Sequence, residues 1–135
     1  MTKQSLVCLD VGEKRIGVAL ADTNVRIAVP FDTIGVDGSE LLAIANIVTA
    51  EKADVIVVGY PRNQSGESTA QTMYAERFAD QLKDMADSVV FQDESLTSVI
   101  AEQRLKEAGR PYEKKEIDAY AAAIILQDYL EENYG

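Results

Sequence analysis

The run LVCLDVGEKRIGVALAD, residues 6–22, decides the fold of this chain. Residues 6–9 are all apolar, as in a strand that is covered on both faces. A short polar turn begins at Gly12, and large and small residues alternate after it. One face of this second segment carries Ile16, Val18 and Leu20, and the other carries Gly17, Ala19 and Ala21. The run therefore predicts two strands joined by a hairpin, the second with almost no side-chain volume on one face.

Asp10 ends the first of these strands. A carboxylate at the end of an apolar strand either caps the turn that follows or holds a positive charge. The position of Asp10 does not by itself separate these two roles.

The remaining chain alternates between apolar strand runs and helical periods. In the second half a helical stripe of Ile117, Tyr120, Ala121 and Ile124 marks the last helix. The predicted elements after the hairpin are an edge strand at 25–31, a helix from 39, a strand at 54–59, a helix at 68–85, a strand at 88–92, a helix from 97 or 98 to 108 and a helix at 113–132.

The resulting order, βββαβαβαα, predicts an α/β fold with a mixed five-stranded sheet and helices on both faces. The first three strands are expected to be antiparallel, and the last two parallel to the first. Ligands of open α/β sheets collect at the carboxyl ends of parallel strands. We therefore expect Asp10, the loop at 59–66 and the pair Asp93–Glu94 to lie along one edge.

Composition narrows the chemistry. The chain has no histidine, which excludes histidine bases and most zinc sites, but it has 23 acidic and 13 basic residues, a net charge of −10. Such a chain favours hard cations such as Mg²⁺ or Mn²⁺. Its acidity argues against tight nonspecific binding along nucleic acid, which depends on lysine and arginine.

Its 135 residues predict one domain, 1–135. No apolar run reaches the roughly 18 residues that a membrane span requires, and no signal peptide is recognised. The single cysteine, Cys8, lies in an apolar strand, which indicates a core residue and a reducing, cytoplasmic setting.

Three acidic positions each interrupt or begin an apolar element: Asp10, Glu94 (with Asp93 as its alternate) and Asp118, predicted in the first turn of the last helix. Ordinary turn and helix-dipole roles would also explain them. The stretch 104–115 is the one clearly basic segment, and it is either a solvated helix end or a contact for phosphates.

Four segments together, LDVGEKRIGVALAD, VVGYPRN..G, DESLTS and DAYAAAIILQDYL, resemble the bacterial YqgF/RuvX family over residues 6–130. The resemblance implies a ribonuclease-H-like fold and a nuclease that matures the 5′ end of pre-16S rRNA during ribosome biogenesis, or one that resembles Holliday-junction resolvases. Ser95 departs from the family pattern, which usually has arginine there.

By the same resemblance, Asp10, Glu94 and Asp118 are the catalytic and metal-binding acids, and Lys14 and Arg15 match the family's basic pair. Two Mg²⁺ or Mn²⁺ ions held by carboxylates would activate water and stabilise the leaving oxygen. The expected contacts to nucleic acid are Lys14, Arg15, Arg62, Asn63, Arg104, Arg110, Lys114 and Lys115. A charged hairpin turn is the other interpretation of Lys14 and Arg15.

Other classes remain open at this stage. Resolution of branched DNA would require a symmetric dimer, and the sequence leaves monomer and homodimer equally open. A sugar-kinase or actin-like protein also has an Asp-x-Gly turn, but it needs two domains. A noncatalytic nucleic-acid-binding module would bind without metal-dependent cleavage.

Overall fold

The computed structural model describes residues 3–61, 70–94, 97–109 and 111–135, with side chains of the third range from residue 99 onward. Within these ranges five strands form one sheet in the order β3-β2-β1-β4-β5. Strand β1 pairs antiparallel with β2, and β2 pairs antiparallel with β3. Strand β1 pairs parallel with β4, which pairs parallel with β5, and this confirms the predicted mixed sheet. The bounds are β1 (Ser5–Val11), β2 (Arg15–Asp22), β3 (Val29–Gly35), β4 (Val55–Pro61) and β5 (Ser88–Glu94).

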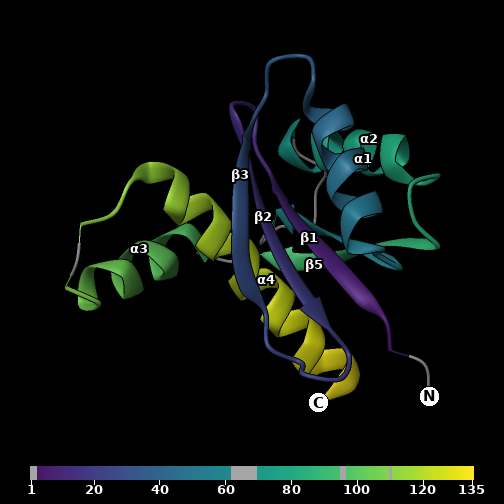
Figure 1. Cartoon of the computed structure of the whole chain (residues 1–135). Helices are drawn as coiled ribbons and strands as arrows, with labels where there is room; N and C mark the ends of the chain where they lie inside the picture. The colour runs from purple at the N-terminus through teal and green to yellow at the C-terminus, as the bar shows by residue number, and fades with distance from the viewer. Residues whose placement is uncertain (1–2, 62–69, 95–96, 110) are drawn as a thin grey trace.

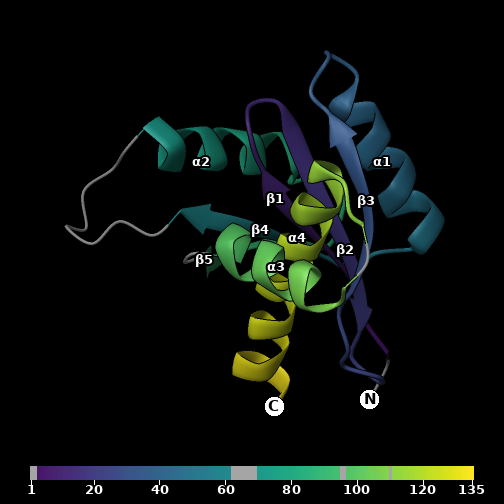
Figure 2. The same cartoon turned by 90° about the vertical axis from the view of Figure 1, so that its left-hand side faces the viewer.

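Helices cover both faces of this sheet (Figure 1). Two of them, α1 (Glu40–Glu51) and α2 (Ala70–Leu82), lie on one face. On the other face α4 (Lys114–Tyr134) crosses the strands, and α3 (Thr97–Glu107) packs against α4 (Figure 2). None of the helices in the described ranges has the length and apolar character needed to cross a membrane.

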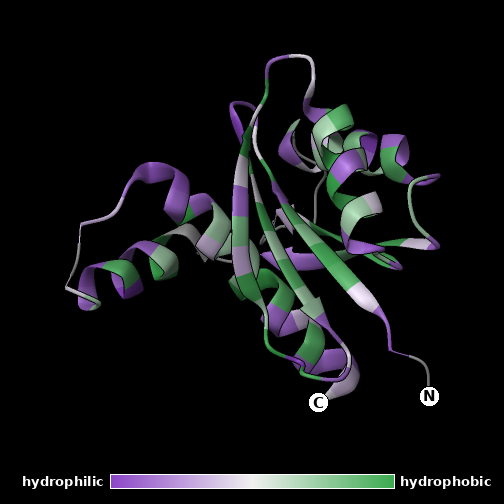
Figure 3. Ribbon diagram, viewed as in Figure 1, coloured by the Kyte–Doolittle hydropathy of each residue, from purple (hydrophilic) through white to green (hydrophobic). Residues whose placement is uncertain are grey.

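The sheet separates two apolar cores. One joins Val7, Leu9 and Ile16 of the hairpin to α1 and α2, where Ile44 and Phe78 are buried. The other places α4 over strands β1, β2 and β4, and its members are Leu6, Cys8, Ala19, Val55, Val57, Ala122, Ala123, Ile125, Leu126 and Leu130. Figure 3 shows this apolar character along β1 and β2. The large residues of β2 therefore face α1 and α2, and its small residues face α4.

Gly17 sets how closely α4 approaches the sheet. A Cβ atom at this position would lie 1.9 Å from the backbone oxygen of Asp118 and 3.0 Å from the backbone nitrogen of Ala119. Real side chains do not tolerate such contacts, so the helix backbone rests directly on the backbone of β2. The small face predicted from the sequence is thus the seat of α4.

The predicted edge strand at 25–31 is wrong in its bounds, because β3 spans Val29–Gly35. The Asp22 side chain accepts hydrogen bonds from the backbone N–H groups of Asn24 and Val25, and Arg26 has a φ of 60°. This turn interrupts the extended chain that the alternating residues predict. The backbone N–H of Ala28 donates a hydrogen bond to the Gln127 side chain of α4 and not to a neighbouring strand.

The edge position of β3 is as predicted, and the strand is protected from further pairing. Pro30 offers no N–H donor, and Phe31 is an extra residue where the register with β2 shifts between Val18 and Ala19. Such devices limit edge-to-edge association of sheets.

Helix α4 is apolar on two sides, which a single stripe does not anticipate. Tyr120 and Ile124 of the predicted stripe lie near α3, where they line a cavity together with Arg104. Ala122 and Ile125 instead pack on the sheet. Because the helix begins at Lys114, Asp118 lies in its second turn and not in its first.

We predict that Gly17→Ala lowers the free energy of unfolding by about 1–3 kcal/mol, because the new methyl group would push α4 off β2. Denaturant unfolding measures this change. Gly35→Ala is the matched control, since nothing lies within 4 Å of a Cβ there. Equal stability of the two variants would contradict the close seating of α4.

Candidate active site

The parallel register brings two acids to the same edge and the same face of the sheet. Leu9 of β1 pairs with Val58 of β4, so Asp10 and Gly59 follow side by side. Pro61 of β4 pairs with Glu94 of β5. By strand alternation Asp10, Gly59 and Glu94 share the face that carries Cys8 and Val57, which is the face under α4.

Gly59 allows the Glu94 side chain to cross the middle strand. A Cβ atom at Gly59 would lie 2.7 Å from Oε2 of Glu94 and 2.9 Å from Cδ1 of Ile125. The carboxyl group of Glu94 therefore rests on the bare backbone of β4 and forms a side-chain hydrogen bond with Asp10 on β1. The sequence predicts that Gly59 starts a loop. In the structure Gly59 belongs to β4, and its missing side chain leaves room for the carboxyl group of Glu94.

Asp118 reaches the site from the opposite layer. Its backbone oxygen lies over Gly17, and its Oδ2 atom accepts a hydrogen bond from Nε of Arg15 at 2.6 Å. Arg15 precedes Gly17 by two residues, so both residues lie on the α4 face of β2. The third acid is therefore close to the other two and is already paired with a cation.

Confinement changes the acid–base behaviour of Asp10. Burial is the largest effect, followed by the charge of Glu94, the hydrogen bond with Glu94 and the charge of Asp118, and together they raise the pKa of Asp10 to about 8. Burial, followed by the charges of Asp10 and Glu94, raises the pKa of the Cys8 thiol well above its usual range. Cys8 is fully buried, in agreement with the predicted core position.

Asp93 lies apart from this group. It is exposed, and strand pairing places it beside Tyr60, on the face opposite to that of Glu94. The Tyr60 ring packs edge-on against Phe91 with centroids 5.0 Å apart, and its hydroxyl donates to Glu76. The structure therefore brings Glu94, and not Asp93, to the same face as Asp10.

A cleft of about 430 Å³ opens beside the acids. Glu94 and Asp118 line it together with Lys14 and Arg15 of the hairpin. The α2 residues Gln71 and Tyr74 form the facing wall. Tyr74 lies one helical turn before the buried Phe78, and this spacing alone cannot tell a core side chain from one at the rim of a cleft.

The predicted basic contacts divide into two groups. Lys14 and Arg15 line the cleft, and Lys114 precedes Asp118 by one helical turn. Arg104 lines a separate cavity beside α3, away from the acids. Burial raises the pKa of Asp128, and the charge of Arg104 opposes this rise. Arg62, Asn63 and Arg110 lie outside the described residues, as does Ser95.

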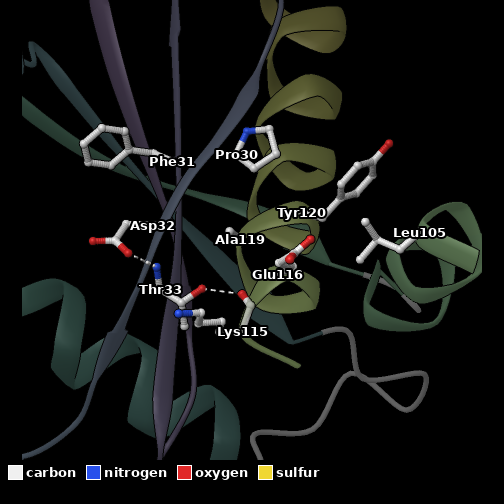
Figure 4. A pocket seen from close by; sticks show the side chains of 9 residues that line it. All are labelled: Pro30, Phe31, Asp32, Thr33, Leu105, Lys115, Glu116, Ala119 and Tyr120. Carbon is white, nitrogen blue, oxygen red and sulfur yellow. Dashed lines mark hydrogen bonds between the residues drawn. The ribbon is translucent and has the colours of Figure 1, made fainter. Parts of the chain in front are cut away.

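Lys115 lines a second cavity, of about 250 Å³, between β3, α3 and α4 (Figure 4). The backbone oxygen of Lys115 accepts a hydrogen bond from the Thr33 hydroxyl, which ties α4 to the edge strand. Tyr120 and Leu105 close the opposite wall. This cavity contains none of the three predicted acids.

The donor atoms of the site suit a hard divalent cation, since all are carboxylate oxygens. The described residues contain no cluster of three acidic side chains that converges as a ready-made metal cage. The acids have other partners in this arrangement: Asp10 bonds to Glu94, and Asp118 bonds to Arg15. The residues fit such an ion in chemistry, and a change of partners would have to accompany its binding.

Solved structures with a similar fold show which class of fold this chain has. Thermus thermophilus RuvC, solved in complex with a Holliday junction substrate, matches with a TM-score of 0.61 and 12% identity over 98% of each chain. The fowlpox virus resolvase, in complex with Holliday junction DNA, matches with a TM-score of 0.55 over 98% of this chain and 100% of that one, at 12% identity. The chain therefore has the ribonuclease-H-like α/β fold of the RuvC-type resolvases.

The family follows from the sequence comparison. A family model described as "RuvX: Holliday junction resolvase" matches residues 4–132, and the chain belongs to the RuvX family. A relative from Chloroflexus aurantiacus is 43% identical over 136 residues, which cover 97% of this chain and 89% of the relative. One from Staphylococcus carnosus is 36% identical over 141 residues, covering 97% and 98%. The names of both assign them provisionally as pre-16S rRNA nucleases, which confirms the resemblance to the YqgF/RuvX family.

We predict that Asp10→Asn stabilises the metal-free protein. Because the folded-state pKa of Asp10 is raised from 3.8 to about 8, its favourable contribution is complete below about pH 4 and is lost as the pH rises through 8. Thermal unfolding in a chelator should therefore show a gain of about 3 °C or more at pH 8 and little gain at pH 4. Asp93→Asn, at an exposed position of the same edge, should show no such trend. A gain that is the same at both pH values would contradict the confinement of Asp10.

Proposed function

We propose that this chain is a metal-dependent nuclease that hydrolyses phosphodiester bonds and processes the 5′ end of pre-16S rRNA. One observation carries the proposal: Glu94 and Asp118 line one cleft, and Asp10 lies against Glu94 beside it, an arrangement that the clearances at Gly17 and Gly59 allow. Like charges held close together lower the stability of a fold. A functional site that requires these carboxylates is the most direct explanation for why the fold keeps them together.

Asp10, Glu94 and Asp118 would hold Mg²⁺ or Mn²⁺, with two ions during the reaction. Such ions supply an activated water and stabilise the leaving oxygen, functions that this histidine-free chain cannot take from imidazole. The acids would hold the ions, while the buried side chains of Cys8 and Ile125 would exclude water from the floor of the site.

Lys14 and Arg15 would contact the backbone phosphates at the mouth of the cleft, with Arg62, Asn63, Arg104, Arg110, Lys114 and Lys115 as further contacts. The net charge of −10 favours a local site over binding along the whole surface. Metal ions would reverse the repulsion between the acids and a phosphate.

We infer that residues 1–135 form one nuclease domain that acts in the cytoplasm, as a monomer or a homodimer. The relatives named for pre-16S rRNA favour structured RNA as the substrate.

A second candidate is a Holliday-junction-resolvase-like DNA endonuclease. The description of the family and the two resolvases solved with junction DNA favour it. This activity would require a symmetric dimer with two active sites. A noncatalytic binding module would use the same cleft without cleavage.

We predict that the wild type cuts a labelled pre-16S 5′-leader RNA when Mg²⁺ or Mn²⁺ is present, and that Asp10→Asn lowers the rate by about 100-fold or more. A four-way DNA junction, assayed in parallel, separates the two substrates. Cleavage of the junction alone would select the resolvase. Metal-independent binding of either substrate without cleavage, equal in both proteins, would select the binding module.

We further predict that Glu94→Gln and Asp118→Asn lose activity to the same degree, whereas Asp93→Asn retains it. The physical reason is strand alternation, which turns Asp93 away from the face that carries Asp10 and Glu94. The same cleavage assay decides the matter, with circular dichroism to verify folding. Loss of activity in Asp93→Asn with a normal Glu94→Gln would reverse the assignment.

A further inference from the structure

The ion pair between Arg15 and Asp118 is unlike the other ion pairs of the described residues. Lys83–Asp80, Lys106–Glu102 and Lys115–Glu113 each join residues at most four positions apart, at 3.5 Å. The pair of Arg15 Nε and Asp118 Oδ2 joins residues 103 positions apart, at 2.6 Å. It links the hairpin to α4 at the mouth of the cleft.

The backbone around this pair is held in place on both sides. Gly17 seats the backbone of Asp118 on β2, and Arg15 lies two residues away on the same face. The Asp118 side chain is 22% exposed and that of Arg15 is 45% exposed, so the bond is partly shielded from water at its acidic end. The fold therefore presents Arg15 to Asp118 directly.

The charges explain why a cation belongs there. Glu94 and Asp118 line the cleft, Asp10 bonds to Glu94 beside it, and the charge of Asp118 raises the pKa of Asp10 further, after burial and Glu94. A guanidinium group on Asp118 offsets part of this repulsion. However, Nε–H of Arg15 occupies Oδ2, one of the two oxygens through which Asp118 could bind a divalent cation.

We propose that Arg15 is a built-in cation that competes with the divalent metal for Asp118, so that the site binds metal only when this ion pair opens. The inference rests on the proposed function, since it assumes that the three acids hold the metal. It assigns to Arg15 a positioning role: Arg15 sets how tightly the site binds its ion.

The test is a Mn²⁺ titration of the full chain, with free Mn²⁺ followed by electron paramagnetic resonance. We expect Arg15→Gln to bind Mn²⁺ about tenfold more tightly than the wild type, because the competitor for Asp118 is gone. Lys14→Gln is the matched control: it removes the same charge from the neighbouring position in the same cleft, but Lys14 has no ion pair with Asp118 among the described residues. It should change the affinity by about twofold at most, the general effect of losing one nearby charge.

A second measurement follows the Arg15 side chain of the wild type directly by nuclear magnetic resonance. The Nε–H resonance of Arg15, identified by its disappearance in Arg15→Gln, should exchange slowly with water while it is bonded to Asp118. Addition of Mg²⁺ should shift this resonance and speed its exchange, and Asp118→Asn should do so without Mg²⁺. A resonance that does not respond to saturating Mg²⁺ would overturn the competition.

The outcomes separate the two proposals. If Mn²⁺ binds the wild type and is lost in Asp10→Asn, but Arg15→Gln and Lys14→Gln have equal affinities, the competition is wrong and the proposed metal site stands. If Mn²⁺ binds neither the wild type nor Arg15→Gln, both the competition and the metal-dependent mechanism are wrong.

Discussion

Three carboxylates held close together at one edge of the sheet are the constraint on which the rest of this structure depends. Water normally screens such charges, but Asp10 lies largely out of water, between Glu94, which reaches it across the intervening strand β4, and Asp118 of α4. The arrangement persists because each acid has a partner: the carboxyl groups of Asp10 and Glu94 bond to one another, and Asp118 bonds to Arg15. The hydrophobic layers on the two faces of the sheet supply the free energy that offsets the remaining repulsion.

Two glycines give this constraint its geometry. Gly17 brings the backbone of α4 onto β2, which sets the height of Asp118 above the sheet. Gly59 leaves the middle strand bare, so that the Glu94 side chain can cross it toward Asp10. In both places a single methyl group would occupy space that the site requires. The site is therefore defined as much by missing side chains as by the acids themselves.

Much of the fold could be predicted because hydrophobic periodicity is a local property of the chain. The hairpin, the buried strand β4 and the order of the elements follow from it, and the resemblance to the family selects the same three acids. The bounds of β3 could not be predicted, since the alternation at 25–31 continues through a turn that the Asp22 side chain and the left-handed Arg26 impose. The sheet-facing side of α4 was also missed, because α3 covers a second apolar side of the same helix.

The sequence by itself determined that the chain forms an α/β sheet, that its chemistry depends on carboxylates without histidine, and that Asp10 ends a buried strand. Only the tertiary structure decided between Asp93 and Glu94 as the acid on the face of Asp10, because alternation has a meaning only once a strand has a neighbour and a helix above it. The tertiary structure also placed Arg15 on Asp118, across 103 positions of sequence. A contact between residues so far apart in the sequence depends on how whole layers pack. Local residue patterns do not show which distant residues will meet.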